Sequence, residues 1–286
     1  MAFKRVLLLL RSYPMQTPAS AARAAVDIAA MLDARISALS CAIRRHVPKG
    51  ILSGVVGTVS ALVGQENKQV VEGAQQLLDT FSDLAKRRGV MGQAVYRHCP
   101  PNEVPKLLAG YARVNDLTIL PMPEGGYFER LDSHWYLEAA LFESGRPILA
   151  LPHGYPSPGA DAFGNVVVAW DQTRAAARAL ADAMPILQRA RSVRVVTITN
   201  EKAILEEPPP YEVVLHLAAH NVRAEHDAVD AKGRDAATAI VEYLRAHSGD
   251  LLVMGGYGRS RLREVILGGA TKHILTHPPV PVLMSH

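Results

Sequence analysis

Apolar residues in this chain come in short continuous runs that alternate with alanine-rich amphipathic stretches. The run KRVLLLLRS (4–12) precedes SAARAAVDIAAMLD (20–33), and GNVVVAWDQ (164–172) precedes RAAARALADAMPILQRA (174–190). A strand covered on both faces of a parallel sheet is apolar throughout, whereas a surface helix repeats its apolar positions every three to four residues. The pattern therefore predicts strands that alternate with helices.

The alternation continues through both halves of the chain. In the first half we expect further strands at 34–42, 91–98, 117–120 and 147–151, with helices at 66–88 and 102–114. In the second half we expect strands at 193–199, 222–229, 251–254 and 281–284, with helices at 211–220 and 233–247. Each half ends with one more helix before its last strand. This order predicts a doubly wound parallel α/β sheet in each half, with ligands at the carboxyl ends of the strands.

The two halves read as diverged copies of one unit. NDLTILP and SGRPILALP in the first half match GDLLVMG and HPPVPVLMSH in the second. Asp116 pairs with Asp250 and Pro147 with Pro281, and both pairs lie 134 residues apart (250 − 116 and 281 − 147). The Pro- and Gly-rich segment between the copies is typical of a linker. We therefore expect one domain at 1–152, a linker at 153–163 and a second domain at 164–286.

Composition narrows the class of protein. Hydrophobic content of 49%, charged content of 20% and a net charge of +4 are typical of a soluble globular protein, and without a dense Lys/Arg run we expect no nucleic-acid partner. The apolar run at 6–10 is too short for a signal peptide, which favours a cytoplasmic location. The stretch at 51–63 is shorter than the roughly 20 residues of a membrane span, so we interpret it as a buried or interface helix, with membrane contact as the lesser alternative. Cys41 and Cys99 are expected to be ordinary buried thiols.

The candidate chemistry lies in a glycine-rich loop near the end of the chain. Gly255, Gly256 and Gly258 follow the apolar run LLVM, and Gly268 and Gly269 stand where the next helix should begin. Glycine lets backbone N–H groups approach a ligand closely, and a helix N-terminus carries partial positive charge. The loop therefore favours a phosphate group, although a tight turn that needs glycine for packing alone is the alternative.

The spacing Gly255-x-x-Gly258, nine residues and Gly268 resembles the pattern of the universal stress protein family, which is GxxG, nine residues, G and then Ser or Thr. The resemblance extends over both halves, so the chain looks like a tandem universal stress protein. It implies a five-stranded fold similar to adenine nucleotide alpha-hydrolases in each half. It also implies that the second half binds ATP or a related adenine nucleotide, with Mg²⁺ as an option.

The resemblance assigns nucleotide contacts to named positions of the second half. Asp171, after the first strand, would meet the adenine end, although it could equally cap the helix that follows. Val196 lies near the expected backbone contact to adenine. The phosphate and ribose contacts would come from Gly255, Gly258, Arg259, Ser260, Gly268, Gly269, Ala270 and Thr271.

One position of the second half departs from the family pattern. Gly269 stands where the family has Ser or Thr, so one hydroxyl donor to phosphate is missing. A neutral hydrogen bond contributes about 1 kcal/mol and one to a charged partner about 1.5 to 3 kcal/mol. Thr271 and Ser260 are the candidates that could replace this hydroxyl.

The first half departs from the pattern throughout. Arg11 replaces the matching Asp, and the matching loop positions hold Pro121, Met122, Glu124, His134 and Trp135. Proline lacks an N–H, glutamate repels phosphate, and an indole fills the cleft. We therefore predict that the first half binds no nucleotide in the manner of the family.

Other functional classes have less support from the sequence. His216 and His220, like His273 and His277, have i, i+4 spacing, but neither pair is part of an HExxH motif, so we expect structural roles and no metal. No nucleophile–base motif indicates an enzyme. The alternatives to a nucleotide-binding protein are a ligand-free interaction module, which implies a protein partner, and a slow ATPase. Family members pair through their last strands, so we expect either a monomer with an internal pseudo-dimer or a homodimer.

Overall fold

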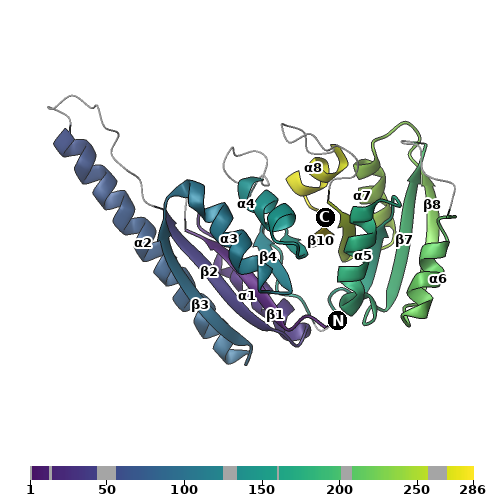
Figure 1. Cartoon of the computed structure of the whole chain (residues 1–286), viewed down its shortest axis with the longest axis horizontal. Coiled ribbons are helices and arrows are strands. Elements are labelled where there is room, and N and C mark those ends of the chain that lie inside the picture. The colour runs from purple at the N-terminus through teal and green to yellow at the C-terminus, as the bar shows by residue number, and fades with distance from the viewer. Residues whose placement is uncertain are drawn as a thin grey trace.

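Strands and helices alternate along both halves of a computed structural model, which describes residues 2–12, 15–43, 56–124, 134–159, 161–200, 208–256 and 269–286 (Figure 1). The elements of the first half are β1 (Arg5–Arg11), α1 (Ala19–Met31), β2 (Arg35–Ile43), α2 (Val56–Arg87), β3 (Met91–Cys99), a 3-10 turn (Pro101–Glu103), α3 (Val104–Arg113), β4 (Leu117–Pro121), α4 (His134–Glu138), a π-helix (Ala139–Glu143) and β5 (Ile148–Leu151).

The second half repeats this order. Its elements are β6 (Asn165–Ala169), α5 (Arg174–Leu187), β7 (Ser192–Thr199), α6 (Glu212–Ala219), β8 (Ala224–Asp230), α7 (Ala236–Ala246), β9 (Leu251–Gly255), α8 (Gly269–Thr276) and β10 (Val282–Ser285). The predicted strands and helices are confirmed, with ends that shift by a few residues everywhere except at the start of α2.

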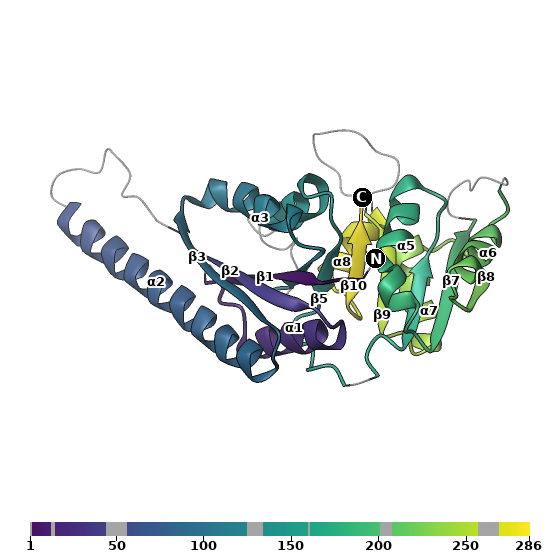
Figure 2. The same ribbon diagram turned by 60° about the horizontal axis from the view of Figure 1, so that its bottom comes forward.

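All strands of the described residues belong to one sheet, in the order β3-β2-β1-β4-β5-β10-β9-β6-β7-β8. Within each half the strands pair in parallel. The last strands of the two halves, β5 and β10, pair antiparallel in the middle of the sheet, with Leu283 opposite Leu149 (Figure 2). The predicted pair of five-stranded doubly wound units is confirmed, and the units join edge to edge within one chain.

Hydrogen bonds from main-chain N–H groups to an aspartate carboxylate recur at matching positions of the two halves. A carboxylate oxygen of Asp116 accepts from the N–H of Arg5 at 2.9 Å, and one of Asp250 accepts from the N–H of Asn165 at 2.9 Å. In each half this aspartate joins the start of the fourth strand to the start of the first. The duplication seen in the sequence is therefore present in the hydrogen bonding.

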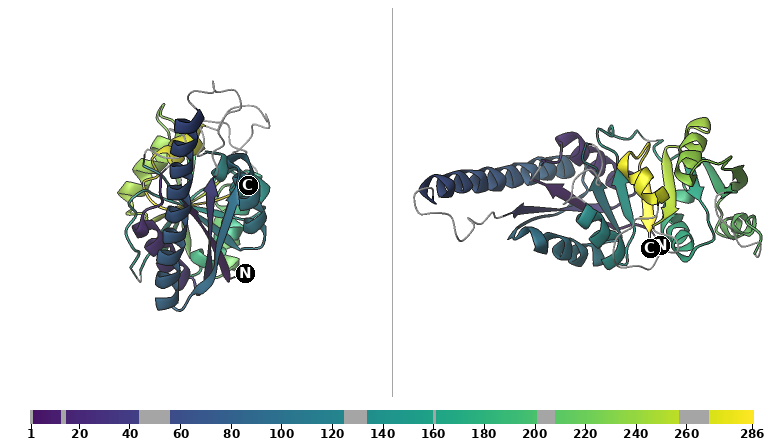
Figure 3. Two further views of the ribbon diagram at one scale, coloured as in Figure 1. Left: turned by 90° about the vertical axis from the view of Figure 1, so that its left-hand side faces the viewer. Right: turned by 90° about the horizontal axis from the view of Figure 1, so that it is seen from above.

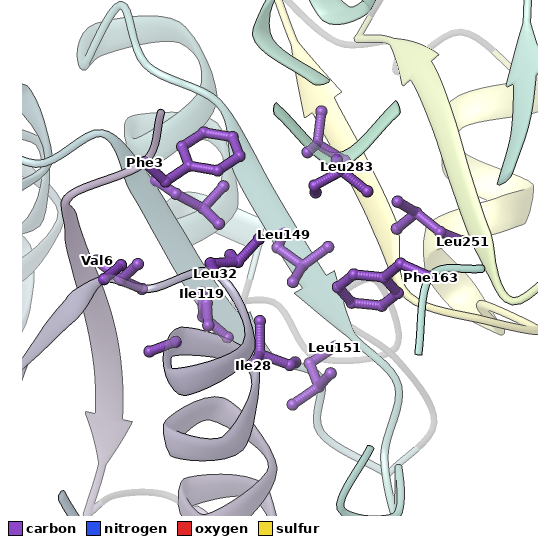
Figure 4. Packing of buried hydrophobic residues seen from close by; sticks show 14 of the residues in the cluster. Phe3, Val6, Ile28, Leu32, Ile119, Leu149, Leu151, Phe163, Leu251 and Leu283 are labelled. Atoms are coloured by element: carbon purple, nitrogen blue, oxygen red, sulfur yellow. The ribbon is translucent and has the colours of Figure 1, made fainter. Parts of the chain in front are cut away.

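Two apolar clusters cover the two faces of the sheet. Helices α1, α2, α5 and α6 pack on one face, and α3, α4, α7 and α8 on the other. Side chains alternate along the strands, so that Leu8 faces the first cluster and Leu7 the second. Leu149 and Leu283 lie in the same cluster, so the core continues across the β5–β10 junction (Figure 4).

Helix α2 differs most from its prediction. It begins at Val56, ten residues before the predicted start, and has 32 residues. Residues 56–63, which we expected as a separate helix, form its first turns, and 51–55 lie outside the described residues. At 1.5 Å per residue α2 is about 48 Å long, so it extends well past the ends of the neighbouring strands (Figure 3). Within the described residues no helix combines the length and apolarity that a membrane span needs.

The predicted linker lies against the first half. The hydroxyl of Ser157 donates to a carboxylate oxygen of Asp27 in α1, and the guanidinium of Arg88, just after α2, lies 2.6 Å from the other oxygen. Asp27 is only 8% exposed, so its charge is neutralised inside a three-way contact between helix, helix and linker. These contacts attach the middle of the linker to the first half of the chain.

Candidate functional site

The carboxyl ends of β6 and β9 bring Asp171 and Gly255 to the same edge of the sheet. The two strands pair in parallel with Ala169 opposite Met254, so the residues that follow each strand emerge side by side. In a βαβ crossover the helix begins near the end of the first strand, and α8 accordingly begins at Gly269 on this edge. The structure therefore brings Asp171 and Gly255 together at one edge of the sheet.

Gly255 packs against the first turn of α5. A Cβ at this position would lie 2.6 Å from the nitrogen of Ala176 and 2.7 Å from the carbonyl carbon of Ala175. Both are main-chain atoms, which cannot rotate away. Glycine is therefore needed here for close packing between strand and helix, whether or not a ligand binds.

Gly256 contacts the first half of the chain. A Cβ here would lie 2.7 Å from Cδ2 of Leu141 in the π-helix, and the N–H of Gly256 donates to the carbonyl of Ser285 at 2.7 Å. In the first half the N–H of Met122 donates to the carbonyl of Leu151 at the same distance. The backbone of the turn therefore recurs, but the buried Met122 side chain stands where the second half has no side chain.

Asp171 takes part in capping α5. Its Oδ1 accepts from the N–H of Thr173 at 3.0 Å and from the Thr173 hydroxyl at 2.6 Å. Thr173 is the N-cap residue, and its hydroxyl oxygen accepts from the N–H of Ala176 at 3.1 Å. The helix is therefore capped by Thr173 and not by Asp171, which supports the capping residue, and the exposed Asp171 stays at the edge of the sheet.

Gln172 is a polar residue at this edge that the sequence patterns did not single out. Its backbone has a φ of 60°, in the left-handed region, and its Nε2 donates to the carbonyl of Pro208 at 2.8 Å. Its Oε1 is buried and accepts no hydrogen bond from any described residue. Only the DQT sequence of a capping turn could have drawn attention to it.

Val196 lies inside the sheet. It is 1% exposed, pairs with Ala169 and Asp227 on its two sides, and its carbonyl accepts from the N–H of Trp170 at 2.9 Å. The strand continues for three more residues to Thr199. The side chain of Val196 contributes to the core, and its predicted contact with adenine stays a prediction.

Gly269, at the start of α8, is exposed. No described atom lies within 4 Å of a Cβ placed on Gly269, whereas Thr271 is only 5% exposed and Ala270 packs against the core. A serine hydroxyl at position 269 would therefore meet no described atom, whereas Thr271 is buried. Gly258, Arg259, Ser260 and Gly268 lie outside the described residues.

The matching edge of the first half is filled by larger side chains. Pro121 ends β4 and, like Met122 and Arg11, is buried. The N–H of Arg11 donates to the hydroxyl of Thr17 at 2.9 Å. Trp135 in α4 is 45% exposed. A buried cation thus ends β1 where an exposed carboxylate follows β6.

The histidine pairs and the cysteines make contacts that are typical of structural residues. The rings of His216 and His220 on α6 are 4.8 Å apart, and Nδ1 of His273 lies 3.3 Å from the carboxylate of Asp235, which caps α7. Among the described residues no three His, Cys, Asp or Glu side chains are grouped to hold a metal ion. Cys41 and Cys99 are free and buried, as predicted, and burial raises the pKa of both thiols.

A network of charged and phenolic groups joins α7 to the outer strands of the second half. The Tyr243 hydroxyl donates to Asp227, and the Arg194 guanidinium lies 2.8 Å from Glu225 and 3.3 Å from Asp227. The hydrogen bond from Tyr243 is the main reason that the pKa of Asp227 lies below its usual range. Burial raises the pKa of Tyr243 to about 12.

Comparison with known proteins agrees with this fold. Residues 162–286 match the model of the Universal stress protein family. A universal stress protein from Archaeoglobus fulgidus DSM 4304 superposes with a TM-score of 0.68 at 16% identity, over 97% of each chain. A functionally unknown protein from Pseudomonas aeruginosa PAO1 superposes with a TM-score of 0.57 at 16% identity, over 99% of this chain and 92% of that one. A search of curated protein sequences found no match. At these identities the solved structures establish a common fold for the whole chain.

Proposed function

We propose that this chain is a non-catalytic stress-response protein that binds ATP or a related adenine nucleotide, because residues 162–286 match the model of the Universal stress protein family and the whole chain has the fold of a universal stress protein. The nucleotide would occupy the carboxyl edge of the second half. The first half would contribute structure and no second site.

The observation that carries this proposal is the exposed Gly269 at the start of α8. Gly269 begins the helix with no described atom within 4 Å of its Cβ position, on the same sheet edge as Gly255 and Asp171. A helix N-terminus with accessible N–H groups favours phosphate. In the first half Met122 is buried on the corresponding edge, which favours a single site per chain.

Calorimetric titration with ATP tests the proposal. We expect about one site per chain, and we expect Gly258→Glu to abolish binding, because a carboxylate in the loop repels phosphate. Gly159→Glu is the matched control: it adds the same charge in the linker, where no described atom lies within 4 Å of the Cβ position. Wild-type protein that gives neither heat nor a thermal shift at millimolar ATP would exclude the proposal.

The variant Gly269→Ser provides a second test, in which ATP affinity should rise. The open space at Gly269 accommodates a hydroxyl, and one hydrogen bond to a charged phosphate contributes about 1.5 to 3 kcal/mol. We therefore expect the affinity for ATP to rise by about tenfold or more. Gly110→Ser, at another open glycine position, should leave it unchanged.

A ligand-free interaction module is the second candidate, and a specific observation favours it. Gly255 and Gly256 are both explained by packing, and Asp171 by helix capping. The described site residues would therefore persist without a ligand. Mass spectrometry of small molecules released from protein purified out of cells separates the two candidates, because only the first predicts a bound adenine nucleotide.

A further inference from the structure

The glycine turn that ends β9 is held from two sides, by Leu141 of the first half and by His286 of the second half. On one side the Leu141 side chain occupies the space where a Cβ of Gly256 would lie. On the other side His286, which follows β10, places its Nδ1 2.8 Å from the carbonyl oxygen of Gly256. Because a carbonyl only accepts, the Nδ1–H of His286 is the donor.

The His286 ring is itself supported by the first half. Phe142 meets it edge to face, with ring centroids 4.8 Å apart and planes at 86°. Leu141 and Phe142 are consecutive residues of the π-helix Ala139–Glu143. A π-helical turn inside a helix is uncommon and often marks a functional position. Here it supplies the Leu141 contact to Gly256 and the Phe142 contact that supports His286.

The arrangement is one-sided. The N–H groups of Met122 and Gly256 make equivalent hydrogen bonds of 2.7 Å to Leu151 and Ser285, but among the described residues only Gly256 has an additional bond through its carbonyl to a histidine. The Met122 side chain packs into the core and anchors its own turn. Gly256 has no side chain, so its turn depends on neighbours for a fixed position.

We infer that Leu141, Phe142 and His286 are positioning residues, through which the first half fixes the backbone of the glycine turn in the second half. The consequence for nucleotide affinity rests on the proposed function. A turn fixed before ligand arrives loses less conformational entropy on binding, so the contact strengthens binding without touching the ligand. The first half would thus act on the one nucleotide site of the chain.

Hydrogen exchange in ligand-free, full-length protein tests the positioning directly. In Phe142→Ala and His286→Ala we expect exchange in the peptide that covers Gly256 to rise by about two- to tenfold, the range for loss of one aromatic contact. The double variant should exchange only slightly faster than either single variant, because both substitutions break the same chain of contacts from Phe142 through His286 to Gly256. Tyr211→Ala, an exposed aromatic on the loop before α6, is the matched control. The peptide that covers Met122 is the internal control and should not change.

Titration with ATP then separates this inference from the proposed function. If wild type binds ATP, Phe142→Ala should weaken the affinity by about two- to tenfold with the stoichiometry unchanged. If wild type binds no nucleotide but the exchange effect is present, the proposed function fails and the positioning role stands. Exchange at Gly256 that stays at the wild-type rate in both single variants would overturn the inference.

Discussion

At the scale of single residues, Gly255 and Gly256 are neighbours that are constrained by different parts of the molecule. A Cβ on Gly255 would meet main-chain atoms of α5, and a Cβ on Gly256 would meet the far end of the Leu141 side chain. A helix backbone cannot move without disturbing its own hydrogen bonds, whereas a leucine can change rotamer. The two glycines therefore differ in how well they tolerate a side chain.

We predict that Gly255→Ala lowers the free energy of unfolding by about 1 to 3 kcal/mol, the usual range for overpacking in a core. Gly256→Ala should cost less, because Leu141 can move aside. Urea denaturation of both variants measures the difference. In the double variant Gly256→Ala with Leu141→Ala, the effect of the alanine at 256 should disappear. Equal losses in the two single variants would contradict this explanation.

The site residues show where sequence reasoning at this scale stops. The pattern of strand ends correctly placed Asp171 and Gly255 on one edge, because parallel pairing follows from the order of elements. The same pattern cannot show that the Thr173 hydroxyl donates a hydrogen bond to Asp171, or that the carbonyl of Val196 accepts one from the N–H of Trp170. Those facts depend on side-chain and backbone geometry that neighbouring residues in space determine.

At the scale of elements, α7 is attached to the outer strands through a phenol and a carboxylate. Tyr243 of α7 donates to Asp227 of β8, and this bond lowers the pKa of Asp227 from 3.8. A carboxyl group whose pKa is lower in the folded state stabilises the fold when ionised. Its contribution is therefore complete above about pH 4 and is lost as the pH falls through the folded pKa.

We predict that Tyr243→Phe lowers the free energy of unfolding by about 1 kcal/mol at pH 7. The expected loss is smaller than the usual contribution of a hydrogen bond to a charged group, because Asp227 is 38% exposed and solvent screens its charge. The deficit should shrink below about pH 4, where the carboxyl is protonated in both proteins. Denaturation at several pH values checks this. Tyr111→Phe, which removes a hydroxyl bonded to Arg97, is the control and should show no such pH dependence in the acid range.

Helix α2 shows the limit of periodicity at this scale. The segment from Val56 to Val63 is apolar and contains Gly57, so it resembles a separate element, and Gly64 suggests a break after it. A single glycine costs a helix only about 1 kcal/mol, which the helix tolerates. Sequence pattern therefore located the packed part of α2, whose partners are β2, β3 and α1, and missed the part that extends past them.

At the scale of the whole molecule, the ten-stranded sheet makes the two halves one structural unit. The β5–β10 pairing and the cluster that contains Leu149 and Leu283 both cross the boundary between the halves. From the sequence, pairing of the two halves through their last strands was expected only because of the family resemblance. The register of the β5–β10 pair is known only from the structure. Burial of shared apolar area couples the stability of the halves.

We predict that both halves unfold in one transition. The chain has two tryptophans, Trp135 in the first half and Trp170 in the second, so each half has its own fluorescence reporter. The variants Trp135→Phe and Trp170→Phe should report the same denaturant midpoint, and circular dichroism should agree with both. The substitutions themselves can shift the midpoint, and circular dichroism of the two variants measures that shift. Fluorescence midpoints that differ by more than this shift would show that the halves unfold independently.

The antiparallel β5–β10 junction also has a genetic consequence. In a homodimer one codon specifies a position on both sides of the interface, so every substitution occurs twice and must suit two environments. Here each side has its own codon. Met122 could enter one half while Gly256 stayed in the other, and Leu141 faces Gly256 with no requirement that its counterpart do the same. The covalent link thus frees the two sides of a symmetric contact to specialise separately.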